Sequence, residues 1–164
     1  MEHPIWSNIF RGFQRRKSKT EIALSLVPVF EDLKKRELKE IGKIVHKREF
    51  LKDEYVFKYS TPGLGMYVII EGEIVIEGED GTEFARLGNG DFFGETALIS
   101  EDKRSASAKA QSDTQVIAFF RSDLLEIIRR NPVFGTKILF NLANIMAKRL
   151  KKSNTLIQEN QSEI

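Results

Sequence analysis

The residues between positions 92 and 107 combine a glycine, a carboxylate and an arginine at a spacing that suits anion binding. Gly94 gives the backbone a position where it turns freely, and residues 95–100 would then form one short helical turn. The first N–H groups of such a turn have no partner inside the helix and attract anions. Arg104 offers a planar guanidinium that holds a phosphate through two hydrogen bonds, and Glu95 would accept hydrogen bonds from a pair of sugar hydroxyls. Together these groups fit a small phosphate-bearing sugar.

The same residues also have a purely structural interpretation. Arg104 would then form a salt bridge with Glu95 or Asp102, and the small residues that follow would pack in a strand. Spacing alone does not distinguish the two interpretations, so both stay open at this point.

Composition argues against several other kinds of chemistry. The chain has no cysteine, which excludes disulfides, cysteine nucleophiles and thiolate metal ligands. His3 and His46 are its two histidines and lie far apart in sequence, so we expect no metal site. His46 is interpreted as a strand-entry or surface residue, and no nucleophile motif is present. The carboxylates of residues 71–83 lack the spacing of a calcium loop. We therefore expect that the protein is not an enzyme.

Length and charge limit the class of protein and its partners. The 164 residues suffice for one domain with a substantial core. The whole chain has a formal net charge of +2. Residues 1–20 carry +4 of formal charge, so the remaining residues carry −2. Residues 71–102 alone carry −9, which argues against a general nucleic-acid-binding surface. No apolar run approaches the roughly 20 residues of a membrane span, and no secretory signal is present, so we expect a cytoplasmic protein.

Short apolar runs separated by turn residues predict β-structure around the anion-binding segment. About six to eight short strands would alternate with turns rich in Gly, Asp, Asn and Pro. Even spacing of this kind is typical of a small antiparallel sandwich or roll. The clearest strand candidates are Tyr55–Tyr59, Met66–Ile70, Ile74–Ile76, Phe84–Leu87 and Gln115–Phe120.

Helical periodicity flanks the predicted strands on both sides. Residues 20–45 have apolar residues at helical spacing, with Pro28 tolerated near a helix start. Ser122 is predicted to cap a short helix, Asp123–Arg130, which an Asn-Pro pair ends. A long helix is predicted to follow, at roughly 132–158.

These elements together predict an α+β fold with an antiparallel, jelly-roll-like β-roll. The roll would span about residues 47–120, between an N-terminal helix and C-terminal helices at about 122–158. The main domain would cover residues 20–160, preceded by a basic amphipathic arm at residues 1–19.

The anion-binding segment resembles the phosphate-binding cassette of cyclic nucleotide-binding domains. Such domains occur in catabolite activator proteins, cyclic-nucleotide-dependent kinases and gated channels. Their cassette reads Phe-Gly-Glu, two further residues, Leu, and then Arg-Ser/Ala-Ala at this spacing. The matching residues here are Phe93-Gly94-Glu95, Leu98 and Arg104-Ser105-Ala106. The similarity extends over about residues 25–155, with agreement in the segments Pro28–Leu33, Gly65–Ile69 and Leu87–Phe93.

The resemblance implies a set of contacts to the sugar and the phosphate of a cyclic purine nucleotide. Glu95 would accept the ribose 2′-hydroxyl, and Gly94 would approach the sugar through its backbone. Arg104 and Ser105 would hold the exocyclic phosphate oxygens. These roles coincide with the chemistry that the residue types themselves suggest.

Two positions depart from the family's usual pattern. Ser60 stands where members usually carry glycine in the turn after the second strand, which concerns the turn geometry more than the ligand. Thr96 replaces a commoner apolar residue, a mild change because this position contributes mainly its backbone. The amides of Thr96 and Ala97 would still lie near the phosphate.

The resemblance also places residues near the purine base. Ser107, at the end of the cassette, would suit a guanine amino group, so cyclic AMP is favoured over cyclic GMP only weakly. Ser153 and Asn154 fall where small polar residues of the long helix touch the adenine in catabolite activator proteins. The alternative for this polar pair is a solvated helix end.

The long helix carries an apolar seam that predicts pairing with a second copy. Its residues recur at helical spacing and would form a parallel, symmetric dimer. In the alternative, this face covers the roll of its own chain. The seam consists of Leu139, Leu142, Met146, Leu150 and Ile157.

The N-terminal arm has an amphipathic pattern of its own at residues 4–17. One helical face would carry Ile5, Trp6, Ile9, Phe10 and Phe13, next to Arg11, Arg15, Arg16 and Lys17. This pattern suits a helix that docks on the main domain, and equally a peripheral anchor for a membrane or a partner.

These observations predict a regulatory module that senses a cyclic nucleotide and transmits its occupancy through the C-terminal helices to an effector protein not yet identified. Catabolite-activator-type regulators continue for about 60 residues into a helix-turn-helix module, whereas this chain ends at Ile164, so no direct DNA binding is expected. The alternative function is a nucleotide-free interaction or membrane-surface adaptor on the same fold.

Overall fold

The computed structural model describes the backbone of residues 19–162, and their side chains except those of residues 156–157 and 159–162. The predicted arm, including the amphipathic residues 4–17, lies outside the described residues. Lys19, which we assigned to the arm, begins helix α2 (Lys19–Leu26).

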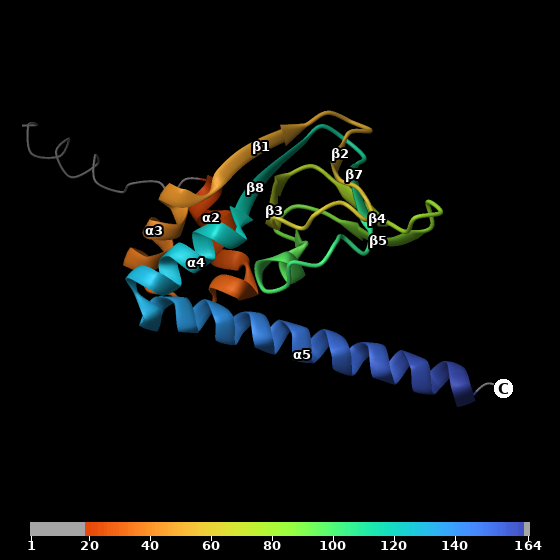
Figure 1. Ribbon diagram of the computed structural model, residues 1–164. Helices are drawn as coiled ribbons and strands as arrows, with labels where there is room; N and C mark the ends of the chain where they lie inside the picture. Colours follow the sequence, from red (N-terminus) through yellow and green to blue (C-terminus); the bar gives the residue numbers. More distant parts are fainter. Residues whose placement is uncertain (1–18, 163–164) are drawn as a thin grey trace, which may run out of the picture.

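Within residues 19–162, eight strands form two four-stranded antiparallel sheets, which confirms the predicted α+β fold with a β-roll. The strands are β1 (His46–Phe50), β2 (Tyr55–Phe57), β3 (Gly65–Glu71), β4 (Ile74–Glu77), β5 (Glu83–Leu87), β6 (Phe92–Phe93), β7 (Ser107–Ala110) and β8 (Thr114–Phe120). The order is β1-β8-β3-β6 in one sheet and β2-β7-β4-β5 in the other. The two sheets face each other as a roll (Figure 1).

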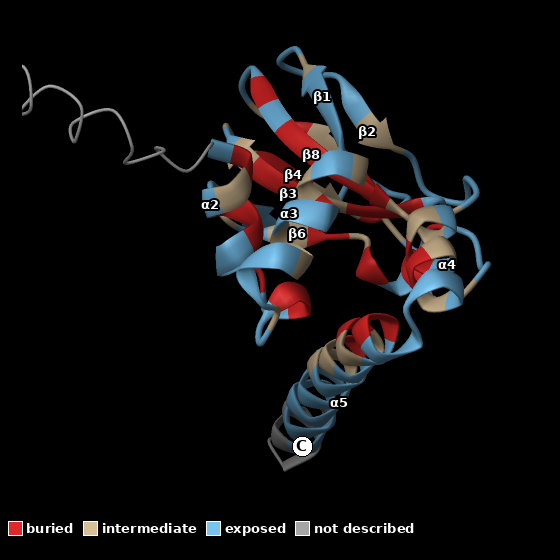
Figure 2. Cartoon of the chain, turned by 90° about the vertical axis from the view of Figure 1, so that its left-hand side faces the viewer, coloured by how far each residue is buried: buried red, intermediate tan, exposed pale blue. Residues whose placement is uncertain are grey.

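The core has two parts, one inside the roll and one beneath the helices. Inside the roll, the inward residues of both sheets pack together, among them Ile69, Ile74 and Val116. Opposite faces of β3 and β8 pack against the helices through Met66, Val68, Ile117 and Phe119. Strands that are buried on both faces read as continuous apolar runs, which explains why their sequences were the easiest to recognise. Figure 2 shows the buried residues along these central strands.

The predicted single helix over residues 20–45 is wrong, because the chain breaks in its middle. After α2, a short 3₁₀ helix η2 (Pro28–Phe30) and then α3 (Lys35–Ile44) follow as separate elements. Val27 is extended, with a ψ of 123°, since a residue that precedes proline avoids the helical region. Asp32 takes a left-handed φ of 64°, which an uninterrupted helix would not allow.

Two helices follow the roll, α4 (Arg121–Arg130) and α5 (Pro132–Ser162), as predicted in outline. The predicted cap at Ser122 is wrong, because the helix starts at Arg121, two residues before the predicted Asp123. Phe120 takes the N-cap position, and its backbone N–H donates to Asp123 Oδ2 at 3.0 Å. The carboxylate at the third helical position thus satisfies the N-cap backbone N–H, which is one of the two bonds of a capping box.

The first half of α5 is fixed to the domain. Phe134, Ile138 and Leu142 are buried in the core beneath the helices. Lys137 Nζ lies 2.9 Å from both carboxylate oxygens of Glu37 in α3. Burial raises the pKa of Glu37, but the hydrogen bonds from the Lys137 side chain and from the Lys34 backbone N–H outweigh it, and the net shift of this pKa is downward. This half of the helix is therefore held as one unit with α2, α3 and α4, which gather at one end of the roll (Figure 1).

The second half of α5 extends past the roll and is largely exposed (Figure 2). The predicted seam therefore needs correction: Leu142 is fully buried in its own domain, and Leu139 packs against the same core. The apolar face that includes Leu139 and Leu142 therefore covers the domain of its own chain. Among the described side chains of α5, the exposed large apolar ones are Val133, Phe140 and Leu150. The side chain of Ile157, the last residue of the predicted seam, lies outside the described part.

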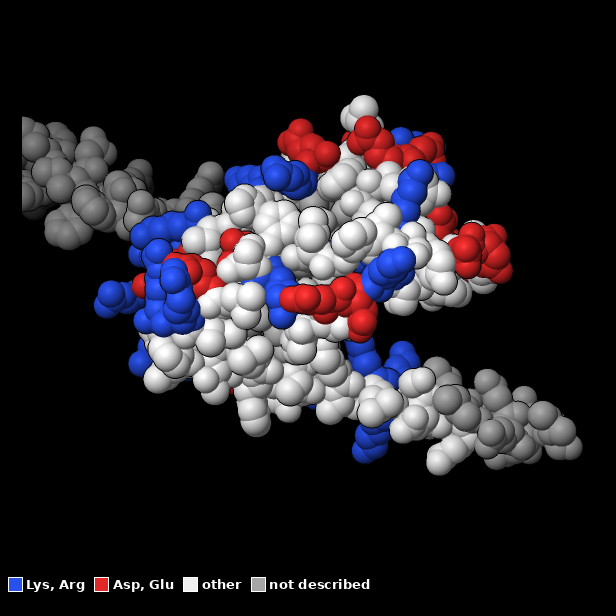
Figure 3. Space-filling model, viewed as in Figure 1, with Lys and Arg blue, Asp and Glu red and all other residues white. Residues whose placement is uncertain are grey.

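Four acids of the acidic stretch lie in the hairpin of β4 and β5, namely Glu77, Glu79, Asp80 and Glu83. At its turn Asp80 accepts a hydrogen bond from the Thr82 N–H at 3.0 Å. Figure 3 shows acidic side chains gathered at this tip of the roll. Within the described chain, no helix is both long enough and apolar enough to cross a membrane.

Candidate functional site

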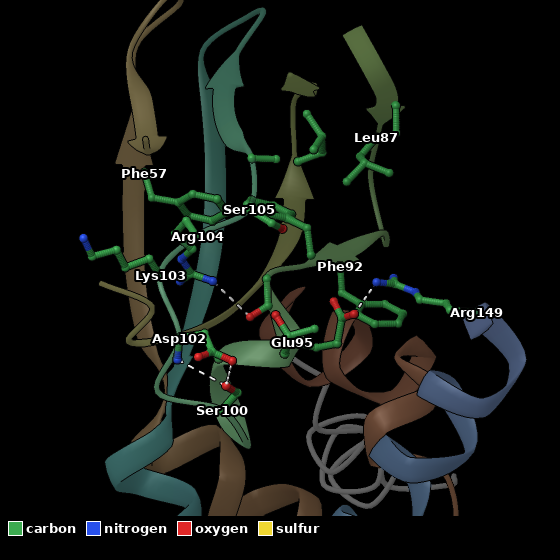
Figure 4. A pocket seen from close by; sticks show the side chains of 17 residues that line it. Phe57, Leu87, Phe92, Glu95, Ser100, Asp102, Lys103, Arg104, Ser105 and Arg149 are labelled. Carbon is green, nitrogen blue, oxygen red and sulfur yellow. Dashed lines mark hydrogen bonds and ion pairs between the residues drawn. The ribbon is translucent and has the colours of Figure 1, made fainter. Parts of the chain in front are cut away.

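A cavity of about 470 Å³ lies between the roll and α5. One side of it is apolar, with Phe57, Ile76, Ala85, Leu87 and Phe92. The other side is formed by the predicted anion-binding segment, and Figure 4 shows Glu95 there between Arg104 and Arg149. A concave site with one apolar wall and a few convergent polar groups is the usual form of a small-molecule site.

The backbone turns sharply where β6 ends, as the sequence predicted. Gly94 adopts a left-handed φ of 73°, and the 3₁₀ helix η3 (Glu95–Leu98) follows directly. A Cβ atom at Gly94 would lie 2.7 Å from Arg104 Nη1, and 3.3 Å from the Gly65 carbonyl oxygen. Glycine is therefore required twice at this position, for its φ and for the close approach of the guanidinium.

Arg104 is held almost completely inside the domain, with 7% of its surface exposed. Its Nη2 donates to the Gly65 carbonyl at 2.7 Å, and its Nη1 donates to the Gly94 carbonyl at 3.1 Å. Among the described residues, no carboxylate lies within ion-pair distance of this guanidinium, so the salt bridge to Glu95 or Asp102 does not form. The charge of Arg104 thus has no local counter-ion of its own.

Aromatic rings surround the same guanidinium. Its Cζ lies 3.9 Å from the centroid of the Phe57 ring and 5.9 Å from that of Tyr67. Burial lowers the pKa of Arg104, but an arginine remains protonated near neutral pH. The rings stabilise the cation through their π faces while they keep water away from it.

The turn after β2 fixes the backbone of Arg104. The Ser60 N–H donates to the Arg104 carbonyl at 2.8 Å, and the Arg104 N–H donates to the Thr61 carbonyl at 2.8 Å. Ser60 adopts a left-handed φ of 62° in order to make this turn. The residue that departs from the family's usual glycine therefore lies directly beside the main arginine.

Replacing Ser60 with glycine is expected to stabilise the protein by about 0.5–1 kcal/mol, since a left-handed conformation costs an L-residue more than glycine loses in the unfolded state. Urea unfolding measures the difference. Ser112→Gly is the matched control, because Ser112 is also exposed and has no positive φ, so its replacement is expected to be neutral or destabilising. A Ser60→Gly variant that is no more stable than the parent would contradict this account of the turn.

Glu95 is the second buried charge of the cavity, with 1% of its surface exposed. Its Oε1 forms an ion pair with Arg149 Nη1 of α5. The guanidinium of Arg149 also lies 5.6 Å from the centroid of the Phe92 ring. Arg149 is thereby the residue through which the second half of α5 reaches the roll (Figure 4).

Two buried polar atoms at this site have no hydrogen-bond partner in the described chain: Glu95 Oε2 and Arg104 Nε. Buried polar atoms normally have partners, because an unpaired one costs about 1–3 kcal/mol. An acceptor and a donor left unpaired at one cavity are suited to a ligand that carries both a hydroxyl and an anionic oxygen.

The predicted ligand residues fall into two groups. Gly94, Glu95, Arg104, Thr96, Ala97 and Ser105 all line the cavity. Ser107 does not, because its buried hydroxyl accepts a hydrogen bond from the Tyr59 N–H at 2.9 Å. Ser153 and Asn154 lie exposed on α5, beyond Arg149, and do not line the cavity either.

Arg149 is the contact that the sequence reasoning missed. It is 54 residues away from Glu95 in sequence and belongs to a basic stretch that resembles a solvated helix face. The available signal was its position one helical turn before Ser153, which we had already assigned to the ligand side of the helix. In the part of the chain that the structure describes, no cluster of His, Cys, Asp or Glu suits a metal ion.

Comparison with known proteins agrees with this geometry. A family model described as the cyclic nucleotide-binding domain matches residues 47–131. The chain is 33% identical over 132 residues to the cyclic AMP receptor protein of Thermus thermophilus. The aligned region covers 77% of this chain and 59% of that protein. The structure also resembles the crystal structure of the Thermus thermophilus catabolite activator protein, with a TM-score of 0.72 at 30% sequence identity. The matched region covers 82% of this chain and 63% of that chain.

A cyclic nucleotide-binding domain from Methylobacillus flagellatus superimposes with a TM-score of 0.74 at 22% identity, over 87% of this chain and 82% of that one, and this likeness shows the fold alone. The chain spans 28%, 59% and 23% of the length of the first curated relatives that it matches. The family model itself matches more than half of this chain and includes both Glu95 and Arg104. The chain therefore belongs to the cyclic nucleotide-binding domain family.

Proposed function

We propose that the protein is a regulatory sensor that binds a cyclic purine nucleotide in the cavity between the roll and α5. The observation that carries the proposal is the pair of unpartnered buried atoms, Glu95 Oε2 and Arg104 Nε. A ribose hydroxyl supplies the donor that Glu95 lacks, and a phosphate oxygen supplies the acceptor that Arg104 lacks. Calorimetric titration of cyclic nucleotide into the purified protein tests this assignment.

The cavity suits the three parts of such a ligand. The phosphate would lie between Arg104, Ser105 and the backbone of η3, whose first N–H groups have no intrahelical partner. The ribose would lie on Glu95 and close to Gly94, where no side chain blocks its approach. The base would rest against the apolar wall formed by residues such as Ile76 and Leu87.

Cyclic AMP is the preferred ligand in this proposal. The hydroxyl that would recognise a guanine amino group, that of Ser107, is already bonded to the Tyr59 backbone. The wall opposite the cassette is apolar and offers no such partner. The similarity to a protein named for cyclic AMP supports the same choice.

Transmission of occupancy would run through Arg149. The ligand's hydroxyl would compete for, or share, the carboxylate that now holds Arg149. Because the first half of α5 is fixed by Lys137 and the core, a change at Arg149 moves mainly the second half of the helix. Helix α5 is thus the element whose position reports ligand binding to an effector.

Replacing Arg149 with alanine is expected to remove this response without closing the cavity. At saturating nucleotide, amide hydrogen exchange over residues 143–155 should change in the parent and stay constant in Arg149→Ala. Lys152→Ala is the matched control, because it removes a neighbouring exposed base that does not line the cavity. An equal response in Arg149→Ala and the parent would contradict transmission through this side chain.

The exposed face of α5 supports a parallel homodimer with a seam different from the one first predicted. Val133, Phe140 and Leu150 lie exposed, and the exposed residues Ala143 and Ala147 continue the same line. Their spacing of seven, three, four and three residues is that of the contact positions in a coiled coil. Asn154 comes at the next such position, where a polar residue fixes the register of the pair.

The proposed role is regulatory rather than catalytic, and the effector would be a separate protein or a further part of the same regulatory system. The rival function, an adaptor that binds no nucleotide, leaves the two buried polar atoms without a purpose. Since unpaired buried atoms destabilise the fold, the sensor accounts better for their presence.

A further inference from the structure

A shallow apolar groove lies on the side of the roll next to α2. It has a volume of about 420 Å³ and is lined by Ile22, Ala23 and Leu26 of α2, and by Ile69 and Ile70 of β3. Ile22 and Leu26 are exposed, one turn apart on the same face of the helix. Two large apolar side chains in a row, above an apolar floor, form a surface that a second helix would cover.

Lys19, the first described residue, lines this same groove. Its Nζ forms an ion pair with Glu71 Oε2 at 3.1 Å at the end of β3. The 18 residues that precede Lys19 therefore join the domain at the groove itself. A segment tethered at this point has a local concentration of the order of millimolar, which favours it over an external partner.

The preceding segment has the side chains that the groove requires. Ile5, Trp6, Ile9, Phe10 and Phe13 would form one face of a helix over residues 4–14. Such a helix would be about 16 Å long, against about 12 Å for α2, so it is long enough to cover the whole of α2. Residues 15–18 suffice for the connection, because two antiparallel helices are joined by about 2–5 residues.

Charge agrees with the same arrangement. The connection would contain Arg15, Arg16 and Lys17, and it would lie beside Glu71. The carboxylate of Glu71 is more than half exposed although it already contacts Lys19, so it remains open to a further base. The apolar face would lie on the groove, and the bases would stay at its acidic rim.

We propose that residues 4–14 form a helix that packs antiparallel to α2 in the groove of the same chain. In this hairpin Phe10 lies next to Ile22, and Trp6 lies next to Leu26, because each pair is separated by one turn along its own helix. The arm is then an intramolecular part of the domain rather than a membrane anchor.

Trp6 is the single tryptophan of the chain, so its fluorescence reports the position of the arm directly. In the parent we expect a blue-shifted emission that acrylamide quenches poorly, in the absence of any lipid. Ile22→Gln and Leu26→Gln, alone and together, are expected to abolish the blue shift and to make Trp6 accessible to the quencher. Both replaced side chains are exposed, so thermal unfolding of the rest of the domain should be little affected.

Leu51→Gln is the matched control, because Leu51 is 64% exposed against 66% for Leu26 and does not line the groove. It is expected to leave the emission of Trp6 unchanged. The proposal would be overturned if Trp6 were accessible in the parent, or if its protection survived the double groove variant. Protection that is lost on dilution would assign the groove to the arm of a second copy. Protection that requires phosphatidylglycerol vesicles would assign the arm to a membrane. Both of these outcomes also contradict the proposal.

Discussion

Replacing Arg104 with alanine is expected to weaken cyclic nucleotide binding on the order of 100-fold or more, since charge-assisted hydrogen bonds contribute roughly 1.5–3 kcal/mol each. The guanidinium is the one buried cation on the cassette side of the cavity among the described residues, and no carboxylate neutralises it. Arg104→Lys keeps the charge but loses the planar fork, so its affinity should fall between those of the parent and the alanine variant.

Two further variants are compared with Arg104→Ala in the same binding measurement. Arg48→Ala removes an exposed arginine of β1 that does not line the cavity, so its affinity should stay close to that of the parent. Glu95→Ala should weaken binding less than Arg104→Ala, because the ribose hydroxyl that it contacts is neutral. Circular dichroism of each variant checks that the roll still folds. If a folded Arg104→Ala variant bound nucleotide as the parent does, the cassette assignment would be wrong.

Replacing Phe140 with aspartate is expected to convert the proposed dimer into a monomer. Each dimer would bury two copies of this side chain, and burial of a phenylalanine contributes roughly 1.5–3 kcal/mol before the cost of a buried charge is added. The dissociation constant should therefore rise on the order of 100-fold or more. Sedimentation velocity at tens of micromolar, with and without nucleotide, measures the change.

Phe84→Asp is the matched control for the dimer. Phe84 is 63% exposed against 66% for Phe140, and it lies on β5, away from α5. It should leave the sedimentation coefficient unchanged. If the parent were a monomer at these concentrations, or if Phe140→Asp were still a dimer, α5 would not be the dimer interface.

Short-range patterns predicted the roll and the cassette well. The positions of Gly94, Glu95 and Arg104 follow from one continuous segment, in which a left-handed glycine, a helical turn and an arginine occur at fixed distances. The strands β3 and β8 were predicted because both faces of each are buried, which makes their sequences continuously apolar. Local sequence suffices where the determinant of the structure is itself local.

The predictions from sequence were wrong where the local structure, or the face of a helix that packs, depends on residues far away in the chain. Helical spacing over residues 20–45 concealed the break at Val27 and Pro28, because the apolar positions on both sides belong to one core. In α5, the spacing of Leu142 and that of Phe140 are equally helical, and only the packed domain decides which face is covered. Periodicity identifies an amphipathic helix but does not identify the surface on which it packs.

The contact between Arg149 and Glu95 could not be predicted from spacing at all. It joins the cassette to a helix that begins 37 residues later, and it depends on how α4 and α5 turn back toward the roll. A buried carboxylate needs a partner, so an expectation of some cation near Glu95 was justified. Which cation supplies it is decided by the tertiary fold.

Isothermal titration calorimetry of cyclic AMP and of cyclic GMP into the purified chain tests the central claim most directly. The sensor account predicts saturable binding of cyclic AMP at one site per chain, weaker binding of cyclic GMP, and the loss of both in Arg104→Ala. If neither nucleotide produces a binding isotherm with a folded parent protein at millimolar concentrations, the sensor account is contradicted and the cavity serves a nucleotide-free adaptor.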